Sequence, residues 1–164
     1  MSLIPAYIAL GSNLSDPVAQ VTSAIEALAM LPDSRLAAIS SLYRTAPVGY
    51  VEQPEFVNAV AMIETALEPR ALLSELLAIE RRYGRVRDVP NGPRTLDLDI
   101  LLYGATLHKD AELTIPHARL HERAFVLVPL SEIAEDVVVP GQGSVRELAA
   151  RVDSAGIRKI ESQQ

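Results

Sequence analysis

Residues 56–79 read FVNAVAMIETALEPRALLSELLAI, a stretch that joins a strand to a helix. The part from Phe56 to Thr65 predicts a strand, because it is short, apolar and rich in β-branched side chains. Pro69 is suited to the first position of a helix, and the leucines that follow form an apolar stripe at helical spacing. We expect this helix to end at Gly84.

Two loops rich in glycine and proline flank this central unit. The first is TAPVGYVEQPE at 45–55, and the second is GRVRDVPNGPRT at 84–95. Beyond the first loop, residues 35–44 are suited to a strand near their end. Beyond the second, LDLDILLY at 96–103 predicts another strand.

The ends of the chain supply one further strand and more helix. IPAYIAL at 4–10 predicts a buried strand stopped by Gly11-Ser12-Asn13, and Asp16 with Pro17 predicts the start of a helix that runs to about Leu31. Thr114-Ile115-Pro116 ends a short extended piece. Residues 117–135 predict helical turns interrupted at Pro129, and Ser144 is the expected cap of a last short helix.

The opening order is therefore strand, helix, strand, strand, helix, strand. This order predicts an α+β fold with a ferredoxin-like (split βαβ) core, in which helices cover a mainly antiparallel sheet. The sequence has no internal repeat or linker, so we expect one domain over residues 1–164.

Composition narrows the class of protein. Of the 164 residues 49% are hydrophobic and 22% charged, as in globular proteins. The net charge of −6 disfavours nucleic acid and anionic membranes as partners. Absence of cysteine excludes disulfides and thiolate chemistry, and no apolar run reaches the roughly 18–20 residues that cross a bilayer. Because the first residues lack the features of a signal peptide, we expect a cytoplasmic protein.

The basic residues are mostly arginine. Thirteen of the fifteen are arginine, and five of these lie between residues 81 and 94: Arg81, Arg82, Arg85, Arg87 and Arg94. Guanidinium groups match phosphate and carboxylate oxygens in pairs, so the cluster indicates a small anionic ligand. The alternative is a solvated helix end, where cations interact favourably with the helix dipole.

Two aspartates in one strand carry the strongest chemical signal. Asp97 and Asp99 are two residues apart, so they lie on one face roughly 6.5–7 Å from each other. Like charges on one face repel, and a divalent cation that also binds polyphosphate oxygens would cancel this repulsion. A solvent-facing amphipathic strand is the alternative. Arg94 directly before this strand favours the first interpretation, since arginine and metal together serve phosphoryl transfer.

Other candidates are weaker when taken alone. Glu80 lies at the margin of an apolar stripe, where pairing with a neighbouring arginine is the simpler explanation. His117 and His121 could face one way on a helix, but HARLH has no thiolate to complete a zinc site, and contact with phosphate is the better functional interpretation of His117. Phe56 and Asn58 on one strand face could hold a planar heterocycle by stacking and hydrogen bonds.

Five blocks together resemble a known family, the 6-hydroxymethyl-7,8-dihydropterin pyrophosphokinases of folate biosynthesis. The resemblance covers roughly residues 4–150, with the blocks in the family's order. They are ALGSNL at 9–14, YRTAPVG at 43–49, QPEFVNA at 53–59, GPRTLDLDILLYG at 92–104 and IPHARLHERAFVLVPLSEIAED at 115–136.

The resemblance implies transfer of pyrophosphate from ATP to the pterin hydroxymethyl group, with release of AMP. It implies two Mg²⁺ ions held by Asp97 and Asp99, with Asp97 also catalytic, and neutralisation of the moving phosphates by Arg85 and Arg94. It implies an ATP pocket formed by Glu80, Arg87, Ile100, Thr114, His117 and Arg123. It implies a pterin pocket formed by Thr45, Val48, Phe56, Asn58 and Phe125. The family fold is a three-layer α-β-α version of the ferredoxin-like pattern.

The sequence departs from the family pattern at Asn91, Ala118 and Glu112, where aromatic or arginine side chains are common. These departures concern loop closure and nucleotide affinity, and the chemistry is not affected. We expect a monomer that binds ATP and the pterin. A non-catalytic ferredoxin-like module that binds a small regulatory ligand is the alternative, and it predicts no nucleotide turnover.

Overall fold

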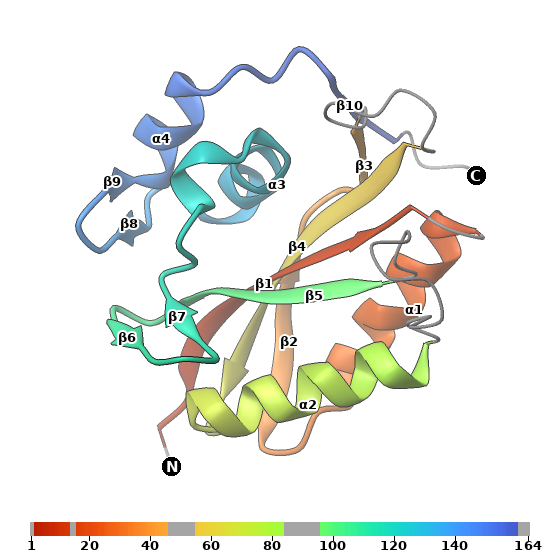
Figure 1. Ribbon diagram of the computed structural model, residues 1–164, viewed down its shortest axis with the longest axis vertical. Coiled ribbons are helices and arrows are strands. Elements are labelled where there is room, and N and C mark those ends of the chain that lie inside the picture. Colours follow the sequence, from red (N-terminus) through yellow and green to blue (C-terminus); the bar gives the residue numbers. More distant parts are fainter. Residues whose placement is uncertain (1, 14–15, 46–54, 84–95, 161–164) are drawn as a thin grey trace.

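Ten strands and four α-helices are found in the part of the chain that the structure, a computed structural model, describes: residues 2–13, 16–45, 55–83 and 96–160. Figure 1 shows their arrangement. The elements are, in chain order, β1 (Ile4–Ser12), α1 (Pro17–Ala29), β2 (Ser34–Ile39), β3 (Tyr43–Thr45), β4 (Phe56–Thr65), α2 (Pro69–Arg82), β5 (Asp97–Tyr103), β6 (His108–Lys109), β7 (Thr114–Ile115), the 3-10 helix η1 (Leu120–Glu122), α3 (Ala124–Ala134), β8 (Val138–Val139), β9 (Gly143–Ser144), α4 (Val145–Arg151) and β10 (Ile157–Lys159).

The main sheet has six strands. Its order is β10-β3-β4-β1-β5, and β2 also pairs with β4. All of these pairings are antiparallel. The predicted antiparallel sheet with helices is therefore confirmed, and the strand predicted from Phe56 to Thr65 has those bounds.

Residues 35–44, which the sequence predicted to be suited to a strand near their end, contribute to two strands, β2 and β3. β2 pairs with the C-terminal half of β4 and β3 with its first residues. Ser40 lies between them, where its backbone N donates to the Val60 carbonyl at 2.8 Å and its Oγ accepts from the Val60 N at 2.9 Å. At the break between the two strands, the Ser40 hydroxyl thus takes the place of a backbone carbonyl as the acceptor for the Val60 N. Hydrophobic patterning does not reveal such a side-chain bond.

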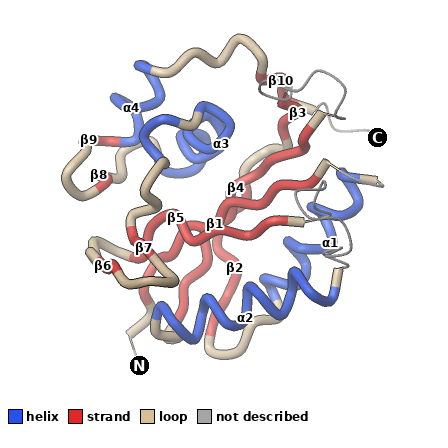
Figure 2. Tube along the Cα trace, viewed as in Figure 1, coloured by secondary structure: helices blue, strands red, loops and turns tan. Residues whose placement is uncertain are grey.

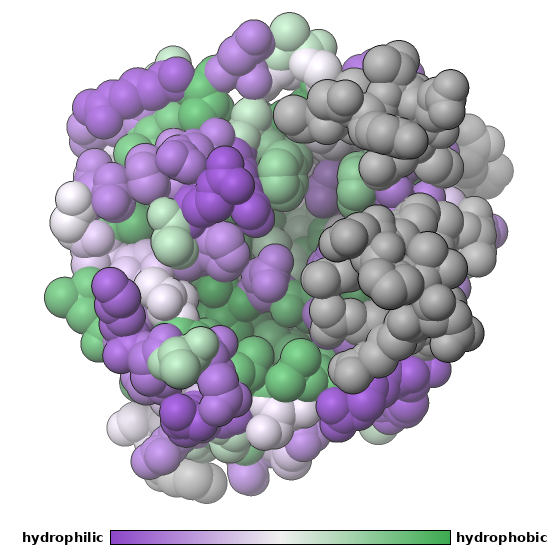
Figure 3. All heavy atoms as spheres, in the orientation of Figure 1, coloured by the Kyte–Doolittle hydropathy of each residue, from purple (hydrophilic) through white to green (hydrophobic). Residues whose placement is uncertain are grey.

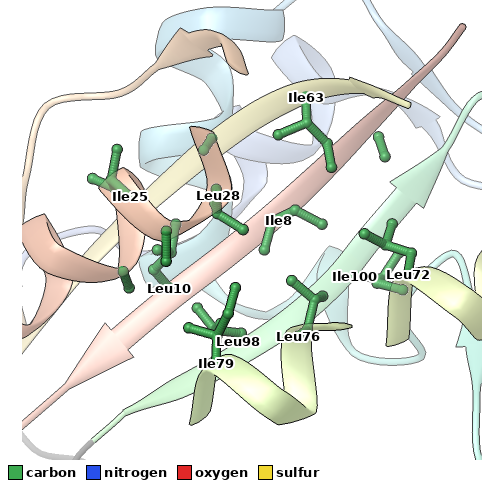
Figure 4. Close-up of a cluster of buried hydrophobic side chains, with 14 of the residues drawn as sticks. Ile8, Leu10, Ile25, Leu28, Ile63, Leu72, Leu76, Ile79, Leu98 and Ile100 are labelled. Carbon is green, nitrogen blue, oxygen red and sulfur yellow. The ribbon is translucent and has the colours of Figure 1, made fainter. Parts of the chain in front are cut away.

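One face of the sheet is packed against α1 and α2. The core between them includes Ile8 and Leu10 of β1, Ile25 and Leu28 of α1, and Leu76 of α2 (Figure 4). Burying a side chain of this size contributes about 1.5–3 kcal/mol to stability. Asp16 caps α1 by accepting from the Ala19 N at 3.2 Å, and Pro17 and Pro69 begin the two helices as predicted.

The opposite face is packed against α3 and α4. Its core includes Tyr7 and Val60 from the sheet, Leu127 and Leu130 from α3, and Leu148 from α4. Figure 2 shows these helices in blue on the side of the red strands away from α1 and α2. Helices therefore lie against both faces.

The predicted interruption at Pro129 is wrong. α3 continues through this residue, which is buried in the helix interior. A proline removes one backbone hydrogen bond, and burial of the surrounding apolar residues offsets that loss. Ser144 caps α4 as predicted by accepting from the Glu147 N at 3.2 Å.

The β8–β9 hairpin and β10 are not in the sequence prediction, because each strand has only two or three residues. In the space-filling view hydrophobic residues occupy a hollow in the middle of the face, and hydrophilic residues surround much of it (Figure 3). Across the described ranges, no helix has both the length and the apolar character that crossing a membrane requires.

Candidate active site

A row of three cross-strand neighbours lies at one end of the sheet. In β1, Gly11 pairs with Asn58 of β4 on one side and with Asp97 of β5 on the other. Two residues earlier, Ala9 pairs with Val60 and with Asp99. Because side chains alternate along strands, both rows belong to the face that α3 covers elsewhere. The sequence predicted that β1 stops at Gly11, but β1 continues to Ser12 and thereby forms this row.

The Asn58 side chain is fixed within the row. It is 7% exposed, and its Nδ2 donates to Thr45 Oγ1 at 2.9 Å. A β-carbon built on Gly11 would lie 2.8 Å from Asn58 Oδ1. The missing side chain at position 11 therefore provides the space that the carboxamide occupies.

The two aspartates lie on the α3 side of β5, while Leu98 and Ile100 between and after them belong to the α1–α2 core. Asp97 is partly buried and Asp99 is exposed. Within the described residues no cluster of three or more histidines and carboxylates could hold a metal ion. Two carboxylates do fit Mg²⁺, which usually takes one or two protein ligands and completes its shell with water and phosphate oxygens.

His117 lies close to one of these carboxylates, that of Asp99. Its backbone N donates to the Leu101 carbonyl of β5 at 3.0 Å, and its Nδ1 accepts from the Arg119 N at 3.2 Å. Burial lowers the pKa of the imidazole, the Asp99 carboxylate acts in the opposite direction, and Arg123 and Arg119 lower it further. The His117 imidazole thus lies near one carboxylate, that of Asp99, and near the two guanidinium groups of Arg119 and Arg123.

Arg123 also contacts an aromatic ring. Its guanidinium carbon lies 5.5 Å from the centroid of the Phe125 ring, a cation–π distance. Phe125 lies in the first turn of α3 and packs partly against the core beneath that helix. Phe56 at the start of β4 is partly buried and shares the sheet face of Asn58.

Glu80 is buried, although the sequence placed it at the margin of a stripe. It is 4% exposed, and its Oε2 accepts from the Leu98 N at 2.8 Å. The carboxylate of α2 therefore binds the backbone of β5 between Asp97 and Asp99. Ile100, another residue predicted for the ATP pocket, is also buried: its side chain is 3% exposed and lies in the α1–α2 core.

Thr114 lies on the β6–β7 hairpin, which a hydrogen-bonded aspartate holds in place. Asp110 Oδ1 accepts from the backbone N of Glu112 and of Leu113, at 2.8 and 2.9 Å. Its Oδ2 contacts His108 Nε2 at 2.8 Å and Arg70 of α2 at 2.9 Å. The local sequence pattern does not mark Asp110 as important, because its role depends on a turn and on a distant helix.

The two spaced histidines do not share a helix. Residues 117–119 are non-helical and η1 begins at Leu120. His117 and His121 line a cavity of about 80 Å³ together with residues of the β8–β9 turn. Of the sequence departures, Ala118 is exposed and Glu112 lies 3.7 Å from Arg70.

Some predicted site residues lie outside the described residues. They are Val48, Arg85, Arg87 and Arg94, together with the departure at Asn91.

Paired carboxylates beside an imidazole and arginines are typical of enzymes that act on metal-bound polyphosphates. The family model of 7,8-dihydro-6-hydroxymethylpterin-pyrophosphokinase (HPPK) matches residues 7–135. The chain belongs to this family.

Two proteins with similar sequences match this chain over most of their own lengths. A protein of Haemophilus influenzae named 2-amino-4-hydroxy-6-hydroxymethyldihydropteridine pyrophosphokinase is 52% identical over 146 residues, which are 89% of this chain and 91% of that protein. The Bacillus subtilis protein of the same name is 40% identical over 153 residues, which are 93% of this chain and 88% of that protein.

A solved structure has a similar fold. Wild-type HPPK-DHPS of Plasmodium falciparum has a TM-score of 0.71 at 14% sequence identity, and the match covers 91% of this chain and 41% of that one. At this identity the likeness concerns the fold alone.

Proposed function

We propose that this chain transfers the pyrophosphoryl group of ATP to the hydroxymethyl oxygen of 6-hydroxymethyl-7,8-dihydropterin and releases AMP. The observation that carries the proposal is the row Asn58–Gly11–Asp97. Neighbouring strands are about 4.8 Å apart, so the amide suited to a heterocycle and the carboxylate suited to a metal are about 10 Å apart on one face. That separation suits a substrate with a ring at one end and a reacting hydroxyl at the other.

The pterin is proposed to bind at the β3–β4 side of the row. Thr45 and Asn58 are joined by a hydrogen bond, and they present a hydroxyl and a carboxamide to a heterocycle edge. Phe56 and Phe125 supply ring faces for stacking, and Val48 completes this set.

ATP is proposed to bind at the β5 side. His117, which lies near both Asp99 and Arg123, is suited to phosphate oxygens, as is the Arg123 guanidinium. The remaining positions of this pocket are Arg87 and Thr114, together with Glu80 and Ile100, whose side chains are buried on the α1–α2 side of β5 and would act by supporting that strand. Since Glu80 is bonded to the Leu98 backbone, its contribution includes fixing the strand that carries both aspartates.

Asp97 and Asp99 are proposed to hold two Mg²⁺ ions that arrive with the nucleotide. Bound Mg²⁺ would neutralise charge on the polyphosphate and orient it for in-line attack. The two-carboxylate donor set fits an ion that shares its ligands with phosphate and water.

In the proposed reaction the pterin hydroxyl oxygen forms a bond to the β-phosphorus, and the bond from that phosphorus to the α–β bridging oxygen breaks. Asp97 accepts the hydroxyl proton, and AMP leaves with the bridging oxygen. Arg85 and Arg94 hold the oxygens of the two phosphates that move.

We also propose that the chain forms a single domain. Its fold would be ferredoxin-like, with three layers in the order α-β-α. The helices packed on both sheet faces support this arrangement. A monomeric state and a cytoplasmic location are also predictions within it.

The test is product analysis with ATP analogues. With ATP, Mg²⁺ and the pterin, we expect AMP and pterin diphosphate. An analogue with methylene between the α and β phosphorus atoms should bind without turnover, whereas one with methylene between β and γ should react. ADP as the product would show a different kinase, and binding with no turnover of ATP would favour the regulatory module.

A further inference from the structure

Gly11 has an ordinary extended backbone. The glycines with positive φ among the described residues are Gly104, Gly141 and Gly143. Residue 11 lies within β1 and pairs with strands on both sides. Its backbone conformation is therefore open to any residue, and the reason for glycine must be the space above it.

That space is occupied by the carboxamide of Asn58. A β-carbon at position 11 would lie 2.8 Å from Oδ1 and 3.9 Å from Cγ of Asn58. The first distance is too short for a carbon and an oxygen that are not bonded, so one group would have to move. Asn58 is 7% exposed and bonded to Thr45, which leaves rotation of the amide as the way to relieve the contact.

The orientation of this amide decides what it offers to a ligand. Nδ2 points towards β3 and donates to Thr45 Oγ1. Oδ1 lies over Gly11, on the side of the row that leads to Asp97. The carboxamide thus presents an acceptor oxygen towards the middle of the face, where an N–H group of a heterocycle would meet it.

We propose that Gly11 is a positioning residue for the pterin: by having no side chain, it keeps the Asn58 carboxamide turned so that Oδ1 accepts a hydrogen bond from the ring. This inference rests on the proposed function, because it takes the pterin as the ligand of Asn58. It adds a residue that binds no ligand atom through a side chain of its own and acts through its neighbour.

The test measures binding separately from chemistry. Calorimetry with 6-hydroxymethylpterin on protein saturated with Mg²⁺ and α,β-methylene-ATP gives the pterin Kd, and titration of that analogue alone gives the nucleotide Kd. Gly11→Ala should weaken pterin binding about tenfold or more, the scale of an unmade buried hydrogen bond. The nucleotide Kd should stay within about twofold, as for distant and independent sites.

A double-mutant cycle tests the route of the effect. Asn58→Ala should weaken pterin binding by itself, and adding Gly11→Ala should then change the Kd by less than about twofold, because the clashing amide is gone. The control is Glu26→Ala at an exposed position of α1, on the opposite face of the sheet. It should leave both dissociation constants unchanged.

Thr45→Val is the second variant. It keeps Gly11 but removes the acceptor of the Asn58 Nδ2 bond, so pterin binding should weaken even if Gly11→Ala does not fold. Normal pterin affinity in a folded Gly11→Ala protein, or in Thr45→Val, would overturn the inference. So would a further tenfold loss when Gly11→Ala is added to Asn58→Ala. Failure of the proposed function is a different result, in which the wild-type protein neither binds the pterin nor releases AMP.

Discussion

The two faces of the sheet are built from the same strands but differ at one end. On the α1–α2 face, Val57, Leu10 and Leu98 continue the apolar core to the strand ends. On the α3–α4 face the apolar core gives way at the equivalent height to Asn58 and Asp97, with Gly11 between them.

Because of this difference, the α1–α2 face mainly stabilises the fold, and the end of the α3–α4 face is available for a reaction. A face packed along its whole length stabilises the fold and leaves no space for a ligand. A face packed along part of its length exposes alternate positions of the same strands, which polar residues can occupy without disturbing the core. Changes on one face should therefore affect unfolding, and changes on the other should affect turnover.

The largest effect is expected at the aspartates. Asp97→Ala or Asp99→Ala should lower the rate of AMP release by on the order of 10³, the upper scale of losing one transition-state interaction. The melting temperature should not fall, because loss of one like charge relieves repulsion on the strand face. The control is Glu26→Ala, at an exposed position of α1. Near-normal rates in both aspartate variants at saturating Mg²⁺ would remove the metal assignment.

Arg94, three residues before the start of β5 in the sequence, tests whether an arginine adds to the charge neutralisation proposed for the aspartates and their Mg²⁺ ions. Arg94→Ala should lower kcat by roughly 10²–10³ if the guanidinium binds charge that develops during transfer. Steady-state kinetics should show a smaller change in KM. An effect on KM alone would mean that Arg94 binds the ground and transition states equally.

Substitutions on the α1–α2 face should lower the stability of the fold. Leu76 of α2 is 0% exposed, so Leu76→Ala should lower the free energy of unfolding by about 2–5 kcal/mol. At a temperature where the variant is folded, kcat should match the wild type. Leu107→Ala is the control, since Leu107 is 74% exposed. A large loss of kcat in folded Leu76→Ala would contradict the separation of the two faces.

The smallest effect is expected at Asp110, whose hairpin contributes Leu113 to the α1–α2 core and carries Thr114. The Glu112 backbone N, His108 and Arg70 hold the pKa of Asp110 at about 2, below its ordinary 3.8. Because the folded pKa is lowered, the ionised group stabilises the fold above pH 4, and this contribution disappears as the pH falls towards 2.

Chemical unfolding of the wild type and of Asp110→Asn should show this pH dependence. The stability difference between them should be constant above pH 5 and should shrink between pH 4 and pH 2. A difference that does not change over this range would mean that the turn is held by geometry without the charge.

The sequence predicted what depends on local pattern. The strand from Phe56 to Thr65, the cap at Asp16 and the helix start at Pro69 each follow from residues close together in the chain. The alternation in LDLDILLY likewise placed both aspartates on the face opposite Leu98.

What depends on register and on distant partners was not predictable. The pairing of Gly11 with Asn58 and Asp97 is set by strand register over separations of more than 40 residues, and hydrophobic pattern alone does not specify which residues face each other. The burial of Glu80 depends on a backbone donor in another strand. The interruption expected at Pro129 failed because tertiary burial outweighed a local rule.

A carboxylate near the end of α3 fixes that helix to β3 and to the segment just before it. Glu132 Oε1 accepts from the Ser41 N at 2.8 Å and from the Tyr43 hydroxyl at 2.7 Å, and its Oε2 accepts from Ser41 Oγ at 2.7 Å. Burial raises the pKa of Glu132, but the bonds from Ser41 and Tyr43 outweigh it and lower the pKa overall.

These bonds make Glu132 a pivot. Phe125 lies seven residues earlier on the same helix, at a lever arm of about 10 Å given the rise of 1.5 Å per residue. With the far end pinned, Phe125 can move relative to the sheet mainly by tilting of the helix, and each 5–6° of tilt displaces it by about 1 Å at that arm. A tilt of a few degrees about Glu132 would thus change how far Phe125 lies from the sheet, while the end of α3 stays bonded to Ser41 and Tyr43.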